Sequence, residues 1–161
     1  MTDEDTLPIQ PVEPGYRTVL RVHALMLAAP LALAAIVADQ LLLRKNDLPW
    51  GFLSVFAVLA VLIWVVGVPG RKYQRLGYAM GADALRVVRG MMFHTDTVVP
   101  FVRVQHIDVG AGPIERMAGV AHLVVHTAGA HNSIVTLPGL NREAAMAMRD
   151  TIRAQIQTDF A

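Results

Sequence analysis

The longest apolar stretch of the chain runs from residue 50 to residue 68 and contains no charged side chain. Ser54 is its one clearly polar residue, and three cations follow it at Arg71, Lys72 and Arg75. At about 1.5 Å per residue, a helix of this length reaches about 28 Å, close to the roughly 30 Å of hydrocarbon that a spanning helix must cross. The pattern therefore predicts a membrane-spanning helix with a basic flank at its end.

A second apolar segment, about residues 19–43, comes before this helix in the chain. Asp39 lies near its end, where we expect the carboxylate to reach the headgroup region. Pro30 lies in its middle and predicts a kink, which a neighbouring helix makes tolerable. Because only residues 44–49 separate the two segments, we expect a tight antiparallel hairpin, with Trp50 at the membrane interface.

Two other interpretations of the segment 19–43 are open. A cleavable signal peptide would explain its short alanine-rich core, but the residues before it are acidic and rich in proline, whereas a leader is short and basic. A buried helix of a soluble protein is the other interpretation. The uncharged centre beside a second apolar segment favours two membrane spans over both.

The positions of Lys and Arg predict the orientation of the hairpin. Three cations follow the second segment, Arg17 and Arg21 precede or open the first, and the loop between them has two cations and Asp47. Because cytoplasmic flanks carry the excess of Lys and Arg, we expect both termini in the cytoplasm.

The remaining chain is divided between a short tail and one domain. Residues 1–15 are acidic and contain three prolines, so we expect a disordered, solvated tether. The hairpin occupies residues 16–70, and residues 71–161 are enough for one small domain with its own core.

Residues 71–161 read as short strands followed by one helix. Turn signals separate β-rich runs, which predict strands at 72–80, 84–90, 91–100, 101–109, 120–127 and 132–137. The apolar alternation slips by one near Gln105 and His106, which predicts a β-bulge. Residues 113–117 predict one helical turn, and Asn141 predicts the N-cap of the final helix. That helix has an apolar stripe at Ala145, Met148, Ile152 and Ile156.

Composition excludes several kinds of function. The chain has a net charge of +1, contains no cysteine and shows no basic run interleaved with aromatic residues, so we expect no disulfide, no thiolate metal site and no nucleic acid partner. His122 and His126 would be about 13 Å apart along a strand, too far to share a metal ion. There is no Gly-x-Ser-x-Gly signature either. We therefore predict no catalytic residue, no metal and no cofactor.

A set of residues between 69 and 129 matches a known family in order and spacing. They are Pro69, Arg71, Gly77, Tyr78, Asp83, Leu85, Gly90, the runs 100–106, 112–116 and 119–121, and Leu123, Val125, Thr127, Ala128 and Gly129. Attached to a two-helix hairpin, they resemble the bacterial pleckstrin-homology-like (PH-like), membrane-flanked domain proteins. The resemblance implies two membrane helices followed by a cytoplasmic PH-like barrel or sandwich closed by a C-terminal helix, in a bacterial inner membrane. It implies no settled activity.

The resemblance points to Arg103, Gln105 and Arg116 as candidate binding residues. Two guanidinium groups and an amide can hold a carboxylate, a lipid phosphate or a partner's backbone. The alternative is that they brace the fold by bonding loop carbonyls, with Asp108 or Glu115 pairing an arginine.

We therefore expect a non-catalytic interaction or scaffolding module anchored in the membrane. Ala28, Ala32 and Ala35 allow close helix approach, which favours self-association or a companion membrane protein. The alternative function is recognition of anionic lipid headgroups by the cytoplasmic domain.

Overall fold

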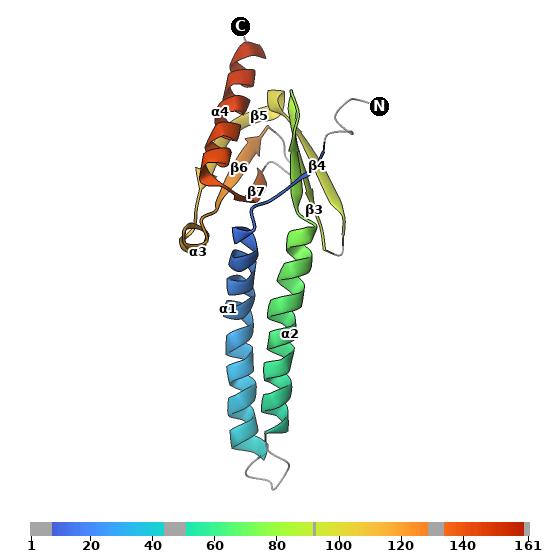
Figure 1. Ribbon diagram of the computed structural model, residues 1–161, viewed down its shortest axis with the longest axis vertical. Helices are drawn as coiled ribbons and strands as arrows, with labels where there is room; N and C mark the ends of the chain where they lie inside the picture. The colour runs from blue at the N-terminus through green and yellow to red at the C-terminus, as the bar shows by residue number, and fades with distance from the viewer. Residues whose placement is uncertain (1–7, 44–50, 92, 129–133, 160–161) are drawn as a thin grey trace. The chain divides into compact units, whose positions relative to one another are not determined.

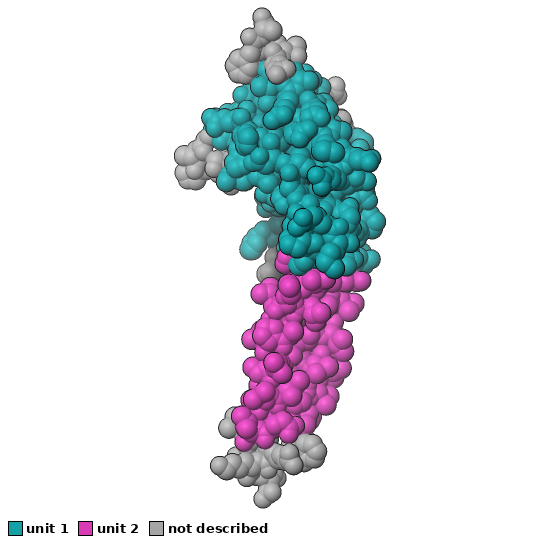
Figure 2. Space-filling model, turned by 90° about the vertical axis from the view of Figure 1, so that its left-hand side faces the viewer, with its two compact units in different colours: residues 1–18, 72–161 teal, residues 19–71 magenta. Residues whose placement is uncertain are grey.

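The computed structural model describes residues 8–43, 51–91, 93–128 and 134–159 (Figure 1). The chain separates into two compact units, coloured separately in Figure 2. Residues 19–71 form the helical unit, and residues 1–18 together with 72–161 form the β-rich unit.

Two long helices make up the helical unit. Helix α1 (Gly15–Ala38) continues into a short π-helix, η2 (Asp39–Leu43), and α2 covers Phe52–Gln74. Both are long and apolar enough to cross a membrane, and only 11% and 6% of their most apolar windows are buried. A core helix of a soluble protein is mostly buried, so these helices do not have that pattern.

The two helices lie side by side (Figure 1), and small residues of both line one cavity between them. Ala28 and Ala32 of α1 line a cavity of about 190 Å³ together with Ala57 and Ala60 of α2. Ala28 is buried and Ala32 is half-buried. This part of the predicted alanine face is therefore turned toward the other helix of the hairpin.

Among the described residues of the helical unit, Asp39 is the charged residue that is buried, and its side chain turns into the hairpin instead of reaching outward as the sequence suggests. It is fully buried, and Oδ2 accepts hydrogen bonds from the backbone N–H of Gly51 at 2.9 Å and from Oγ of Ser54 at 2.5 Å. Oδ1 is buried without a hydrogen-bond partner among the described residues. The carboxylate therefore caps the first turn of α2 across the hairpin, because the N–H groups at a helix start have no partner inside the helix.

The β-rich unit contains two antiparallel sheets. Strands β1 (Gln10–Pro11), β2 (Gly77–Met80), β3 (Ala84–Arg89) and β4 (Thr95–Pro100) form one sheet in that order. Strands β5 (Val104–Gly110), β6 (Ala121–Thr127) and β7 (Ile134–Leu140) form the other. A 3-10 turn, η4 (Phe101–Arg103), joins β4 to β5.

The sheets are not closed into a barrel, so that part of the predicted fold is corrected. Among the described strands, no ladder pairs β4 with β5 or β1 with β7. The cause lies at η4, where the backbone coils into a turn and buries Phe101 in the core instead of continuing a ladder. Buried residues of both sheets and of the last helix form one hydrophobic cluster.

The last helix and the bulge are as predicted. Helix α4 (Arg142–Asp159) begins where Asn141 Oδ1 accepts the N–H of Glu143, and it covers the three-stranded sheet (Figure 1). Its stripe is buried at Ala145, Met148 and Ile152. The ladder between β5 and β6 shifts register between Val104 and His106. Helix α3 covers Pro113–Met117, the predicted turn.

Several predicted strand boundaries are wrong. β4 begins at Thr95 and β5 at Val104, not at residues 91 and 101, and β7 ends at Leu140, not at residue 137. The first strand begins at Gly77 rather than at residue 72, because α2 continues past Pro69 and Gly70 to Gln74. The described part of the tail is not a solvated tether. Residues 10 and 11 pair with β2, and Val12 is 3% exposed in the core, with its carbonyl bonded to the hydroxyl of Tyr73. Residues 1–7 lie outside the described chain.

Candidate functional site

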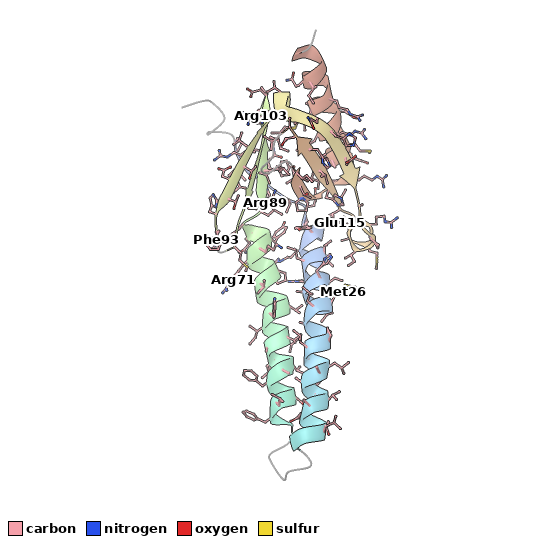
Figure 3. The ribbon with its side chains drawn as sticks, turned by 180° about the vertical axis from the view of Figure 1, so that it is seen from behind. Met26, Arg71, Arg89, Phe93, Arg103 and Glu115 are labelled. Atoms are coloured by element: carbon pink, nitrogen blue, oxygen red, sulfur yellow. The ribbon has the colours of Figure 1, made fainter. Side chains whose placement is uncertain are left out.

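The structure places the three predicted binding residues at two ends of one strand. Arg103 belongs to η4 and Gln105 to the start of β5, whereas Arg116 lies on α3, beyond the end of β5. A seven-residue strand is about 20 Å long, so the two arginines cannot share one small ligand. Figure 3 shows Arg103 at one end of the β-rich unit and Glu115, the neighbour of Arg116, toward the other.

The carboxylates that were expected to brace these arginines have other partners. Asp108 lies 2.8 Å from Nε2 of His106 and 3.4 Å from Nε2 of His126. Glu115 accepts the N–H of Gly112 at 2.7 Å and lies 2.7 Å from Nδ1 of His122. In the described part of the chain, the side chains of Arg103, Gln105 and Arg116 have no hydrogen bond or ion pair.

Arg116 lines a cavity of about 280 Å³ together with Arg142 and Arg149 of α4, and we call it the arginine cavity. Arg142 and Arg149 are seven residues apart, which places them on one helix face two turns apart. The other side of the cavity is formed by Gly110 and Ala111 at the end of β5.

The arginine cavity carries excess positive charge. Nε and Nη2 of Arg149 contact Oδ1 of Asp150 at 2.9 Å and 2.8 Å. Arg116 and Arg142 are exposed, and neither guanidinium pairs with a described residue. Two free guanidinium groups beside one partly neutralised group suit a carboxylate or a phosphate, which they can bind in a bidentate manner.

A second basic cavity, of about 460 Å³, lies around Arg89, and we call it the Arg89 cavity. Its cations are Arg89 at the end of β3 and Lys72 near the end of α2, and Tyr16, Thr95 and Thr136 add polar groups. Apolar walls come from Leu76, Met91 and Pro138. A cavity with two cations and apolar walls suits an anion that carries a hydrocarbon part.

The sequence places Arg86 and Arg89 on opposite faces of β3, and their environments differ accordingly. Arg86 pairs with Asp96 on β4, and this hydrogen bond lowers the pKa of the Asp96 carboxyl. Arg89 donates from Nη2 to the carbonyl of Thr136 at 3.1 Å, while its Nε is buried without a hydrogen-bond partner in the described chain. Arg89 is therefore a partly buried cation with an unused hydrogen-bond donor, and not an ordinary surface charge.

The Arg89 cavity adjoins the segments that connect the β-rich unit to the two apolar helices. Tyr16 lies in the first turn of α1, and Lys72 lies in the last turn of α2. The guanidinium of Arg17 lies 5.9 Å from the ring centroid of Tyr73, so these two segments are neighbours within the β-rich unit. A ligand in this cavity is thus close to both points where the chain enters the helical unit.

The family of the chain follows from sequence comparison. Residues 18–156 match the family described as "Bacterial PH domain". The chain belongs to this family. The match covers most of both apolar helices and nearly all of the β-rich unit, which agrees with the resemblance carried by the motifs.

A relative in Bacillus subtilis (strain 168) supports the assignment. The "UPF0699 transmembrane protein YdbS" is 26% identical over 148 residues, which cover 90% of this chain and 91% of the relative. No solved structure matches the chain significantly.

Sequence reasoning about this bacterial PH domain chain missed the residues that complete both cavities. Arg142 and Arg149 lie outside the apolar stripe of α4, and their spacing of seven residues is the sequence signal that places them on one face. No local signal connects Lys72 with Arg89, because residues so far apart in the chain come to one cavity only in the folded unit. The described His, Asp and Glu side chains form no group of three with the geometry to hold a metal ion.

Proposed function

We propose that this bacterial PH domain chain is a membrane-anchored, non-catalytic module that binds an anionic lipid headgroup in its Arg89 cavity. The single observation that carries the proposal is the pair of cations, Arg89 and Lys72, in a partly apolar cavity beside both connections to the apolar helices. A headgroup phosphate would accept a hydrogen bond from the free Nε–H of Arg89, and the glycerol and the start of an acyl chain would pack against the apolar wall.

The proposal includes the topology that the sequence predicts. The two helices cross the inner membrane, both termini are cytoplasmic, and the two sheets with α4 form the PH-like sandwich at the cytoplasmic surface. Anionic lipids give that leaflet a negative potential, so a basic cavity at its surface has its ligand at high local concentration. A topology reporter fused after Ala161 tests the orientation, and a periplasmic signal would contradict it.

The lipid proposal is tested on the full-length protein in mild detergent. Short-chain phosphatidylglycerol, phosphatidylcholine and inorganic phosphate are titrated separately, and thermal unfolding reports binding because a ligand of the native state raises Tm. We expect phosphatidylglycerol to raise Tm more than phosphatidylcholine, and added salt to weaken the effect. A shift from inorganic phosphate as large as that from phosphatidylglycerol would assign the site to a free anion.

Three variants with the same change of charge locate the binding site. Lys72→Gln and Arg89→Gln should each weaken phosphatidylglycerol binding about ten- to a hundredfold, since a charged hydrogen bond contributes about 1.5–3 kcal/mol. Arg153→Gln on α4, outside both cavities, is the control and should bind like the wild type. Equal losses in all three variants would show that only net charge matters and would refute the site.

A second function, scaffolding in a homo- or hetero-oligomeric membrane complex, is supported by the arginine cavity. Its free guanidinium groups suit an acidic side chain of a second copy or of a companion protein. Crosslinking in native membranes tests it, with Arg116→Ala combined with Arg142→Ala against Arg153→Ala. Recovery of monomers alone, under conditions that trap a known complex, would count against this function.

A further inference from the structure

Two large apolar side chains of the β-rich unit are almost fully exposed. Met117, the last residue of α3, is 88% exposed, and Phe93, in the turn between β3 and β4, is 82% exposed. They are the two most exposed large apolar side chains among the described residues of this unit. An exposed phenylalanine and an exposed methionine on two separate turns call for a partner that is itself apolar.

The turn that carries Phe93 lies against the segment that follows the second apolar helix. Nη1 of Arg75 donates a hydrogen bond to the carbonyl of Met91 at 2.7 Å. Gly90 has a φ of +150°, and a Cβ there would collide with the backbone of Phe93, so this tight turn requires glycine. Phe93 is thereby held near Arg75, which follows the uncharged run of the second apolar segment by about two turns of helix.

The turn that carries Met117 lies against the segment that leads into the first apolar helix. The carbonyl of Ala118, the residue after Met117, leaves no room for a side chain at Gly15. The cation–π contact of Arg17 with Tyr73 joins this segment to the one beside Phe93. Figure 3 shows Phe93 and Glu115 of α3 at the same end of the β-rich unit, with Arg103 at the other end.

We propose that Phe93 and Met117 insert into the interfacial region of the bilayer and hold the β-rich unit on the membrane surface. The two side chains flank the connections to both spans, so the anchored chain already brings them to the lipid, and insertion becomes intramolecular. Each has a cation nearby, Arg75 beside the first turn and Arg116 beside the second. Apolar side chains at the acyl boundary with cations at headgroup level are the pattern of interfacial membrane binding.

The inference rests on the proposed membrane anchorage but not on the lipid specificity of the Arg89 cavity. Insertion would limit the motion of the β-rich unit, because two insertion points on either side of the connections would fix its tilt on the membrane. Insertion would also keep the mouth of the Arg89 cavity, which Met91 lines, at the depth of the headgroups.

The test uses the absence of cysteine from the chain. Full-length variants Phe93→Cys, Met117→Cys, Val102→Cys and Ile63→Cys are labelled with an environment-sensitive fluorophore and reconstituted in vesicles of phosphatidylcholine mixed with phosphatidylglycerol. Quenching by doxyl-labelled lipid is compared with quenching by aqueous iodide. Val102 is the matched control, exposed at 64% on η4, and Ile63 on α2 reports anchorage.

We expect labels at positions 93 and 117 to be quenched by doxyl lipid several-fold more than the label at 102, and to be protected from iodide. If the label at 63 is quenched by lipid while 93 and 117 match 102, anchorage holds and this inference is wrong. If the label at 63 is not quenched, the proposed membrane anchorage itself fails. Protection that rises with protein density, together with a disulfide between two unlabelled copies of the Phe93→Cys variant, would assign the surface to a second copy and overturn the inference.

Discussion

Replacing Asp39 with alanine should loosen the helical hairpin, and the effect should depend on Ser54. Asp39 is fully buried and accepts hydrogen bonds from Ser54 and from the N–H of Gly51, so it ties the end of the first apolar segment to the start of α2. The variant removes both bonds at once. A single variant is ambiguous, however, because it also removes the buried Oδ1, which has no partner among the described residues.

The double-mutant cycle of Asp39→Ala with Ser54→Ala isolates the bond between the two side chains. Hydrogen bonds between membrane helices contribute about 0.6 kcal/mol on average and about 1.7 kcal/mol at most. A hydrogen bond from a hydroxyl to a carboxylate belongs in the upper part of that range. We therefore expect a coupling free energy of about 1 kcal/mol, and a further loss of about 0.3–1 kcal/mol when the carboxylate leaves the positive end of α2.

The assay is unfolding of the full-length protein by SDS in mixed micelles. Both tryptophans of the chain, Trp50 and Trp64, belong to the second apolar segment, so their fluorescence reports on the hairpin. The control cycle pairs Ser54→Ala with Gln40→Ala, which changes an exposed neighbour of Asp39 and should be additive. Additive losses in the Asp39 cycle, within about 0.3 kcal/mol, would refute the proposed bond between the two helices.

Three further predictions concern the β-rich unit. Leu123→Ala, at a fully buried position of β6, should lower the free energy of unfolding by about 2–5 kcal/mol in thermal melts, whereas Leu123→Met should cost less than about 1.5 kcal/mol. Arg86 holds the pKa of the Asp96 carboxyl below its usual value, so the pair stabilises the fold above pH 3.8 and loses this effect as the pH falls further. Asp96→Asn should therefore lower the free energy of unfolding by at most about 1 kcal/mol at neutral pH, and thermal melts of the two proteins in strong acid should show no difference. Burial, and secondarily Glu13, raises the pKa of the Tyr78 hydroxyl above 10.0, so its contribution to stability is present below pH 10.0 and disappears as the pH rises through the raised value. Ultraviolet difference titration of the protein against Tyr78→Phe should show ionisation of Tyr78 above pH 10.0, and a pKa of 10.0 or lower would contradict its burial.

Local signals predicted the elements that depend on neighbouring residues. Helix α3 was placed from a proline and its short run, α4 from the cap at Asn141, and the bulge from the slip in alternation near Gln105. Each signal acts within a few residues, where capping, turn chemistry and side-chain period decide the backbone.

Elements that depend on distant partners were predicted less well. The tail has too few apolar residues to fold alone, yet residues 10 and 11 form an edge strand because β2 supplies the backbone partners. The expected barrel does not form, because the turn η4 separates the two sheets. This turn also buries Phe101 in the core. Both outcomes depend on packing that no local window contains.

The sequence by itself determined two apolar helices, the family, and the order of the strands and helices that follow α2, because each is encoded by runs of hydrophobic residues and by short motifs. Only the tertiary structure decided which charges act together. It separated Arg103 from Arg116, joined Arg116 to Arg142, and placed Lys72 beside Arg89. The physical reason is that charge clusters form between residues far apart in the chain, whose distances are fixed by packing and not by spacing along the sequence.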